Sequence, residues 1–335
     1  MKNAPRHAEE HPFAQFIRIL GKGKKGSRSL TRDEACTAFG MILDEACTPE
    51  QLGAFLMLLR VKEESPDELA GFVEAARERI RPPHPINVDL DWSSYAGKRR
   101  QLPWFVLSTL LLAENGYRVF MHGAKGHTLG RLYTEDVFRN LGLPVVSDWE
   151  AAHHELEAHK LVYMPLADLC PRLEHLIQLR PLLGLRSPVH SLARLLNPLD
   201  APSVVQGIFH PPYGPRHAHA AQALGYAHVS VIKGEGGEAE RNPDTATTTW
   251  HVDEGSVTER QWPSLFERRH VKPEDLDVAH LKAVWQGGIA DEYGEAAVVS
   301  TCALALVTLD PETSEADAVA RARTMWQQRN RARLG

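Results

Sequence analysis

The stretch YRVFMHGAKGHTLGR, residues 117–131, joins a short β-rich run to a glycine-rich loop, and this junction decides the fold class. A second β-rich run, HVSVI, stands at residues 228–232, and stretches with helical spacing lie between and around the two runs. Strands that alternate with helices predict an α/β protein with a mainly parallel sheet covered on both faces. A glycine-rich loop at the carboxyl end of such a strand is where α/β proteins bind ligands.

The first eighty residues are predicted to form a helical unit. Three capping boxes follow one another there: TRDE at residues 31–34, TPEQ at 48–51 and SPDE at 65–68. Apolar residues recur at helical spacing after each box. The segment RPPHP at residues 81–85 cannot be helical and is typical of a domain junction. We therefore expect a helical domain over residues 1–82 and an α/β domain over residues 86–335.

The composition excludes a disordered chain and favours a cytoplasmic protein. The 335 residues are 43% hydrophobic and carry a formal net charge of −5. The chain starts without the apolar core of a signal peptide, and no apolar run reaches the ~18 residues of a membrane-spanning helix. Four separated cysteines without a CxxC pair indicate neither a zinc site nor a disulfide framework. We expect no membrane partner, and the acidic balance counts against nucleic acid unless the cations are gathered together.

The first candidate site is the loop GKGKKGSR at residues 21–28. It spells GxGxxG, but it follows a helix where a dinucleotide fingerprint must follow a strand, and it lacks the lysine of a P-loop. Its cations, glycines and lack of acids suit phosphate contacts, and a solvated basic turn is the alternative. The candidate phosphate contacts are Lys22, Lys24, Lys25 and Arg28.

The second candidate site combines two glycine-bearing basic loops. The segment AGKRR at residues 96–100 precedes a predicted helix, whose N-terminus favours anions. Tyr95 and Trp104 flank it, as aromatic residues do in grooves for single-stranded nucleic acid, although a core role for Trp104 is the alternative. The loop after the strand at residues 117–121 adds two further cations. The candidate phosphate contacts here are Lys98, Arg99, Arg100, Lys125 and Arg131.

The rest of the chain carries no recognisable catalytic motif. His122 and His127 have no carboxylate or third histidine at a helpful spacing, so polar loop histidines are the preferred interpretation over metal ligands. GxSxG, HExxH and a plausible Cys/His pair are all missing from the sequence. The segment EGGEAERNPDTATTTW at residues 235–250 is polar and contains glycine, which favours an exposed loop.

The chain resembles the anthranilate phosphoribosyltransferase family over essentially its whole length. The resemblance rests on LTRDEA (residues 30–35), LGAFLMLLR (52–60), ELAGF (68–72), VFMHG (119–123), EDV (135–137), LRPLLGLR (179–186) and LNP (196–198). It implies a nucleoside phosphorylase/phosphoribosyltransferase-like fold. A small helical dimerisation domain, joined by part of residues 168–192, would precede a large α/β domain, and the helical domains would form a homodimer.

The family's catalytic motifs are altered in this chain. The GTGGD loop, which holds phosphoribosyl pyrophosphate and magnesium in the family, corresponds to residues 95–98, where Lys98 replaces the acid. The metal-binding Asp-Glu pair falls on residues 239–240 and is half lost. Carboxylates that recruit Mg²⁺ let a site hold a pyrophosphate leaving group, so the altered site is expected to bind phosphate and to be poorly equipped for transfer. The former cleft comprises Gly97, His122, Gly123, Arg180 and Glu240.

These changes resemble the YbiB-like branch of the family, whose members are regarded as DNA-binding proteins without transferase activity. We therefore expect a homodimer that binds DNA, or RNA, with little sequence preference and with no catalytic residue, metal or cofactor. The alternative is an active phosphoribosyltransferase in which Glu238 and Glu240 hold Mg²⁺ and Arg180 binds the acceptor. A protein-interaction scaffold with solvated basic loops is the third hypothesis.

Overall fold

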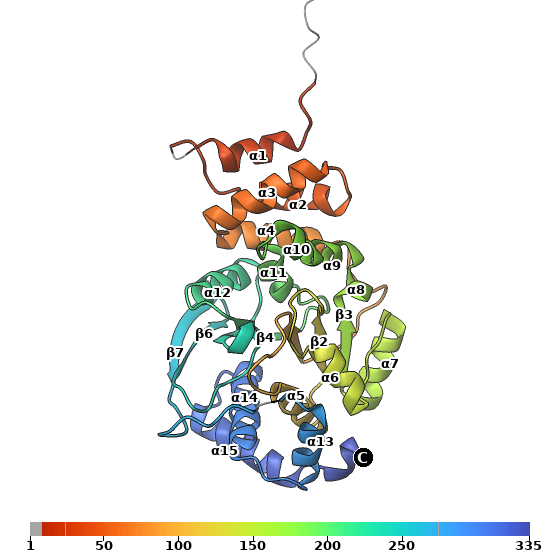
Figure 1. Cartoon of the computed structure of the whole chain (residues 1–335), viewed down its shortest axis with the longest axis vertical. Helices are drawn as coiled ribbons and strands as arrows, with labels where there is room; N and C mark the ends of the chain where they lie inside the picture. The colour runs from red at the N-terminus through yellow and green to blue at the C-terminus, as the bar shows by residue number, and fades with distance from the viewer. Residues whose placement is uncertain (1–8, 24, 274) are drawn as a thin grey trace, which may run out of the picture.

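A computed structural model describes residues 9–23, 25–273 and 275–335 as a helical domain stacked on an α/β domain (Figure 1). The N-terminal helices are α1 (Ala14–Gly21), α2 (Arg32–Leu43), α3 (Pro49–Lys62) and α4 (Pro66–Arg77). All three predicted capping boxes are present and begin α2, α3 and α4. The α2 and α4 helices pack closely at Gly71, where a Cβ atom would lie 2.2 Å from the carbonyl oxygen of Arg32.

Seven strands form one sheet in the order β3-β2-β1-β4-β5-β6-β7. The parallel strands are β1 (Leu90–Ser94), β2 (Val119–Gly123), β3 (Leu161–Pro165), β4 (Ser203–Ile208) and β5 (His228–Lys233). An antiparallel hairpin of β6 (Thr247–Asp253) and β7 (Ser256–Trp262) completes one edge. The predicted fold class, an α/β protein with a mainly parallel sheet behind a small helical domain, is confirmed.

Helices cover both faces of the sheet, and the apolar residues of the strands divide between two cores. One core holds α5 (Phe105–Glu114), α6 (Thr134–Leu141), α13 (Val278–Gln286), α14 (Glu292–Leu309) and α15 (Glu315–Gln328). The other holds α7 (Trp149–His159), α12 (Tyr213–Ala223) and the N-terminal helices. The short 3₁₀ segments are η1 (Ala193–Leu195), η2 (Glu235–Gly237) and η3 (Arg331–Leu334).

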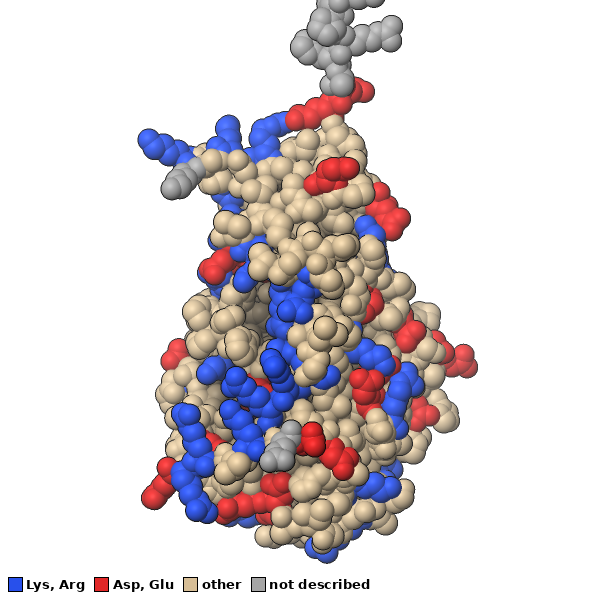
Figure 2. Space-filling model, in the orientation of Figure 1, with Lys and Arg blue, Asp and Glu red and all other residues tan. Residues whose placement is uncertain are grey.

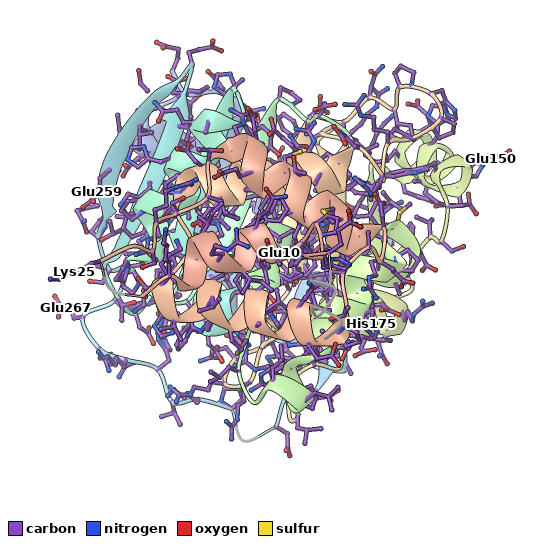
Figure 3. The ribbon with its side chains drawn as sticks, turned by 90° about the horizontal axis from the view of Figure 1, so that it is seen from above. Glu10, Lys25, Glu150, His175, Glu259 and Glu267 are labelled. Atoms are coloured by element: carbon purple, nitrogen blue, oxygen red, sulfur yellow. The ribbon has the colours of Figure 1, made fainter. Side chains whose placement is uncertain are left out.

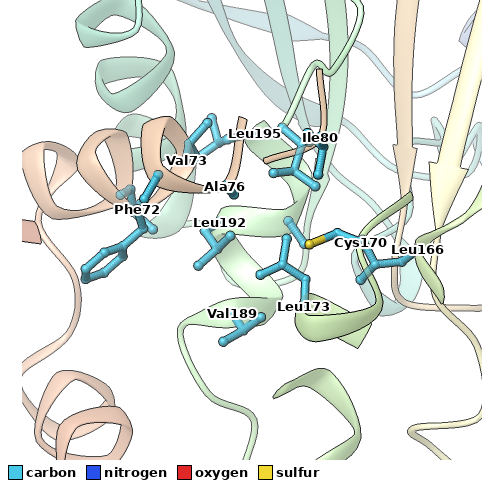
Figure 4. Packing of buried hydrophobic residues seen from close by; sticks show 14 of the residues in the cluster. Phe72, Val73, Ala76, Ile80, Leu166, Cys170, Leu173, Val189, Leu192 and Leu195 are labelled. Carbon is cyan, nitrogen blue, oxygen red and sulfur yellow. The ribbon is translucent and has the colours of Figure 1, made fainter. Parts of the chain in front are cut away.

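The chain between β3 and β4 packs beneath α4 and joins the two domains. It forms α8 (Leu166–Leu169), α9 (Pro171–Gln178), α10 (Arg180–Leu183) and α11 (Val189–Leu192). Figure 4 shows Val73 and Ala76 of α4 beside Leu192 of α11, all within one continuous buried cluster. The helical domain therefore shares its apolar core with the α/β domain, which holds the loops between them in place.

By length and composition α14 is long and apolar enough to cross a membrane, although Glu292 and Glu295 interrupt its apolar sequence; 78% of it is buried inside the protein, as in a core helix. One expectation from the sequence needs correction, because the expected exposed loop at residues 235–250 is wrong. Residues 236–241 are buried, and β6 begins at Thr247. Polar residues can be buried there because their side chains find hydrogen-bond partners in the loop after β1.

Candidate functional site

The carboxyl ends of the parallel strands bring four loops to one edge of the sheet. The loops follow β1, β2, β4 and β5 and comprise residues 95–104, 124–133, 209–212 and 234–241. We call residues 234–240, which carry three glutamates, the acidic strap. The strap lies tightly against its neighbours, since a Cβ atom on Gly207 of β4 would lie 2.4 Å from the backbone of residues 237–238.

Glu238 of the acidic strap fills the turn that follows β1. Its Oε1 accepts hydrogen bonds from the backbone N–H groups of Ala96 (2.6 Å) and Gly97 (2.5 Å). Its Oε2 accepts one from the Ser94 hydroxyl at 2.8 Å. Gly97 has φ +67°, a left-handed backbone conformation that glycine adopts without strain. The donors that suit a phosphate in such a turn are thus occupied by a side chain of the protein itself.

The other two strap glutamates accept hydrogen bonds from further backbone N–H groups of this loop and of the start of α5. Glu235 Oε1 accepts from the N–H groups of Arg99 (3.2 Å) and Arg100 (2.6 Å). Glu240 Oε2 accepts from the N–H of Phe105 at 2.9 Å, where α5 begins. A carboxylate at a helix N-terminus is stabilised by the helix dipole, so Glu240 takes the position that favours an anionic ligand.

Lys98 is buried in the centre of this arrangement, with 1% of its surface exposed. Its Nζ lies 2.5 Å from Glu240 Oε1 and 3.4 Å from Glu235 Oε2. Burial opposes the charge, but the carboxylates of Glu240 and Glu235 outweigh it and raise the pKa of Lys98. The expectation that Lys98 contacts nucleic-acid phosphates therefore does not fit the structure, because its ammonium is enclosed and neutralised by the strap.

The residues at the former metal position do not fit Mg²⁺. Ala239 offers no ligand, and both Glu240 oxygens are engaged by Lys98 and the Phe105 N–H. Across the described residues, no group of three or more His, Cys, Asp and Glu side chains is placed to hold a metal ion. Mg²⁺ needs several oxygen ligands in near-octahedral geometry, and an ammonium group stands in that space.

His122 and Gly123, at the end of β2, support the loop after β1. His122 is fully buried, with Nδ1 2.6 Å from the Tyr95 hydroxyl and Nε2 3.3 Å from Asp91 Oδ1. A Cβ atom on Gly123 would lie 1.8 Å from the Ser94 carbonyl oxygen, so only glycine fits there. Both residues lie in the former cleft, where they position Tyr95 and β1.

Four arginines gather beside the acidic strap, and we call them the arginine cluster: Arg131, Arg180, Arg186 and Arg194. Arg131 donates from Nη1 to the carbonyl oxygens of Ala96 (2.9 Å) and Gly97 (3.1 Å). Arg180 donates from Nη1 to the His127 carbonyl oxygen at 2.7 Å, and Arg194 donates to that of His190. Among the described residues none of the four forms an ion pair, and neutral carbonyl groups hold the charges of Arg131, Arg180 and Arg194 in place.

The arginine cluster creates a strongly positive region. Burial, together with the charges of the other three members, lowers the pKa of Arg186 to about 10. Burial and the charge of Arg186 lower the pKa of His127 to about 4. Glu238 is a nearby carboxylate whose charge acts on Arg194. A region in which guanidinium pKa values fall is one that an anion would stabilise.

The sequence predictions named Arg131 and Arg180 but missed Arg186 and Arg194. Arg186 stands between Leu185 and Ser187, and Arg194 stands between Ala193 and Leu195, so no basic run marks them. A usable signal exists nevertheless: residues 175–199 contain three arginines and no Asp or Glu.

The remaining predicted cations differ in their surroundings: some are neutralised by carboxylates, some lie on the helical domain, and two are exposed beside the strap. Arg28 forms two hydrogen bonds with the Glu34 carboxylate, and Lys125 pairs with Glu135 at 2.9 Å and Asp136 at 3.0 Å. Arg99 and Arg100 are exposed beside the strap. The cations of the loop between α1 and α2 lie on the helical domain, where Lys25 points away from the body of the molecule (Figure 3). Lys22 is exposed, and Lys24 lies outside the described residues.

A cavity of about 110 Å³ opens between the arginine cluster and the helical domain. Its walls come from α3, the segment of residues 186–194, the end of β4 and α12; we call it the interdomain pocket. Figure 2 shows Lys and Arg side chains gathered down the middle of this face, below the helical domain, with acidic side chains beside and below them. The exposed face of the site is thus basic although the whole chain is acidic.

Comparison with known proteins shows that the chain is similar to transferases. Residues 14–80 match the helical bundle domain of a glycosyl transferase family, and residues 106–328 match its α/β domain. The uncharacterized protein YbiB of Escherichia coli is 30% identical over 69% of this chain and 73% of its own length. An anthranilate phosphoribosyltransferase of Anaeromyxobacter is 32% identical over 78% of this chain and 75% of its own length.

Solved structures show the same fold. Anthranilate phosphoribosyltransferase from Thermus thermophilus superposes with a TM-score of 0.79 at 22% identity, covering 95% of this chain and 94% of the other. The yeast enzyme in complex with PRPP (phosphoribosyl pyrophosphate) and Mg superposes with a TM-score of 0.76 at 16% identity, covering 96% and 95%. These relatives with a named activity are transferases, so similarity alone favours the transferase alternative over the nucleic-acid hypothesis.

Proposed function

The chain belongs to the glycosyl transferase family that includes the anthranilate phosphoribosyltransferases, and on that premise we propose that it binds nucleic acid on a fold whose transferase cleft is closed. The observation that carries the proposal is the arginine cluster. Buried or half-buried guanidinium groups that form no ion pair, in the part of the chain that the structure describes, are stabilised when an anionic ligand binds beside them.

The filled cleft argues against transfer of a phosphoribosyl group. The strap carboxylates accept hydrogen bonds from the backbone N–H groups of residues 96, 97, 99, 100 and 105. Lys98 neutralises Glu240, the residue kept from the metal-binding pair. A pyrophosphate would have to displace several charge-assisted hydrogen bonds and would find no metal to balance its charge.

We propose that the positive groups at this edge of the sheet together form a path for a nucleic-acid backbone. Arg99 and Arg100 stand beside Glu235, and the Arg131 guanidinium lies against the carbonyl oxygen of Gly97 in the same loop. The path continues to Arg194, whose Nη2 lies beside Gly237 of the strap. Spaced cations along a path suit the regular charges of a nucleic-acid backbone, which gives affinity with little sequence preference.

Exposed apolar side chains accompany these cations. Leu129 and Leu182 are 94% and 84% exposed, in the 124–133 loop and in α10, which the bond from Arg180 to His127 joins. Phe209 is half exposed at the end of β4. Aromatic and apolar surfaces beside cations favour unstacked bases, so we propose single strands over duplexes as the preferred form of DNA or RNA. A homodimer through the helical domains, with Lys22 and Lys25 adding phosphate contacts, remains part of the proposal.

A salt titration with single-stranded and duplex oligonucleotides tests the proposal. Six to ten phosphate contacts would lower the affinity by roughly 10³–10⁵ between 50 and 200 mM salt. Weak binding that salt does not change would contradict it.

The transferase alternative rests on the named relatives and on Arg180 in the former cleft. Its test is the formation of a phosphoribosyl product from PRPP, Mg²⁺ and anthranilate. Turnover in that assay would establish the alternative and overturn the closed-cleft interpretation.

A further inference from the structure

The interdomain pocket contains polar groups that no other part of the described chain satisfies. Ser187 Oγ and His190 Nε2 are buried without a hydrogen-bond partner among the described residues, and both residues line the pocket. Their exposed fractions are 5% and 4%. The Gln206 amide nitrogen behind the pocket is also unpaired, while its oxygen contacts His217 Nδ1 at 3.0 Å. Unpaired buried groups that line a cavity point to a ligand that supplies their partners.

The charges at the pocket favour an anion. Arg186 and Arg194 both line it, and each has a pKa lowered by burial and by neighbouring arginines. Glu64 is the carboxyl group in the lining; burial raises its pKa, and it accepts a hydrogen bond from the Tyr213 hydroxyl at 3.3 Å. Burial also keeps the pKa of His190 well below its usual range, so its ring is neutral. Its Nδ1 lies 3.3 Å from the Ser187 carbonyl oxygen, so Nε2 donates to an anion only in the tautomer that gives up this contact.

The size and the lining groups of the pocket favour one class of anion. A cavity of about 110 Å³ is too small for a strand to pass through but admits a tetrahedral group. Two guanidiniums, a hydroxyl and an imidazole suit the dianionic oxygens of a phosphate monoester better than the single charge of a diester. At the wall, the exposed ring of Phe209 packs edge-on against His210, with ring centroids 4.7 Å apart, and offers a face to an aromatic base.

We propose that the interdomain pocket binds the terminal phosphate monoester of a nucleotide, as a strand end or as a free mononucleotide. Arg186 and Arg194 pair with the phosphate, Ser187 and His190 hydrogen-bond to it, and Phe209 stacks on the base. For strand ends the proposal rests on the proposed function, because the rest of the strand then follows the path of Arg131, Arg99 and Arg100.

The experiment compares three single strands of one sequence, with a 5′-phosphate, a 3′-phosphate or hydroxyl ends, in fluorescence polarisation at fixed salt. Adenosine 5′-monophosphate and inorganic phosphate serve as competitors. We expect one phosphorylated end to bind about tenfold or more tightly than the hydroxyl-ended strand, because two charge-assisted hydrogen bonds are gained. Adenosine 5′-monophosphate should remove this gain in affinity of the phosphorylated strand at a lower concentration than inorganic phosphate does.

Two variants distinguish binding of the terminal phosphate in the interdomain pocket from binding of the strand along the path. Arg186→Gln should abolish the difference between phosphorylated and hydroxyl ends, whereas Arg100→Gln should weaken all three strands alike. Ser187→Ala, a smaller change, should reduce the difference even if Arg186→Gln fails to fold.

Each outcome bears on one of the two proposals. Equal binding of all strands without competition by the mononucleotide overturns the pocket and leaves the proposed function standing. Binding of the mononucleotide but of no strand overturns the proposed function and supports the pocket. Equal competition by inorganic phosphate overturns the base contact at Phe209.

Discussion

The ammonium of Lys98 lies 2.5 Å from the carboxylate of Glu240, and the two side chains are 1% and 2% exposed. A positive side chain thus occupies the space between the loop after β1 and the acidic strap. Since an ion pair costs desolvation on both sides, its burial is tolerated only because Glu235 and the Phe105 N–H complete the hydrogen bonding.

This pair gives the first prediction. Lys98→Met leaves the Glu240 carboxylate buried without a cation and should lower the free energy of unfolding by about 3–5 kcal/mol. The double variant Lys98→Met/Glu240→Gln removes both charges while the Gln amide oxygen still accepts from the Phe105 N–H, so it should regain much of the loss. Urea unfolding of the two single variants and the double variant measures the coupling. Additive losses would show that the two groups do not interact.

The second prediction concerns ligands of the former cleft. Millimolar Mg²⁺ should leave the thermal unfolding midpoint unchanged, and PRPP with Mg²⁺ should stabilise no more than PRPP alone. The reason is that the strap already supplies the anions and Lys98 the cation of this site. A ligand that binds the native state raises the midpoint, so a thermal shift that depends on Mg²⁺ would count against a closed cleft.

Local signals in the sequence were sufficient for the helical domain and for two strands. The boxes at residues 31–34, 48–51 and 65–68 are local, and the structure begins α2, α3 and α4 at each of them. The runs at residues 117–121 and 228–232 overlap β2 and β5. Such elements are predictable because the hydrogen bonds that define them join residues only a few positions apart in the chain.

The candidate site depended on contacts between distant segments and was predicted only in part. Lys98 and Glu240 stand 142 residues apart, and nothing near Lys98 in the chain indicates that carboxylates enclose it. Residues 235–240 looked like an exposed loop because their polarity is usual in loops, whereas the turn after β1 satisfies them. Arg186 and Arg194 become a cluster only when the 124–133 loop and the segment after α10 meet.

The third prediction distinguishes free from neutralised cations. Arg99→Gln/Arg100→Gln should lower the slope of log affinity against log salt by roughly 2, since each lost phosphate contact removes about one counterion. Lys125→Gln should change the slope far less, because Glu135 and Asp136 already neutralise that lysine. Salt titrations of the two variants beside the unaltered protein provide the comparison. Equal slopes for all three proteins would remove Arg99 and Arg100 from the interface.

The fourth prediction is a loss of stability in mild acid. Burial, with the charge of Arg194, lowers the pKa of His217 to about 3, and burial with Arg186 lowers that of His127 to about 4. An unfolded histidine has a pKa near 6.5, so below that pH the unfolded chain binds more protons than the native one and stability falls. At pH 5 each histidine should cost about 2 kcal/mol of unfolding free energy relative to pH 7.

His217→Gln tests this dependence, because glutamine still offers an amide to Gln206 but does not titrate. Between pH 6.5 and 5, its unfolding free energy should fall less steeply than that of the unaltered protein, by about 1.1 kcal/mol per pH unit. His154→Gln, at a side chain that is 78% exposed, is the matched control and should keep the original slope. Parallel loss of stability in His217→Gln and the unaltered protein would mean that the native state already binds a proton at His217. Burial and the charge of Arg194 would then not lower the pKa of His217.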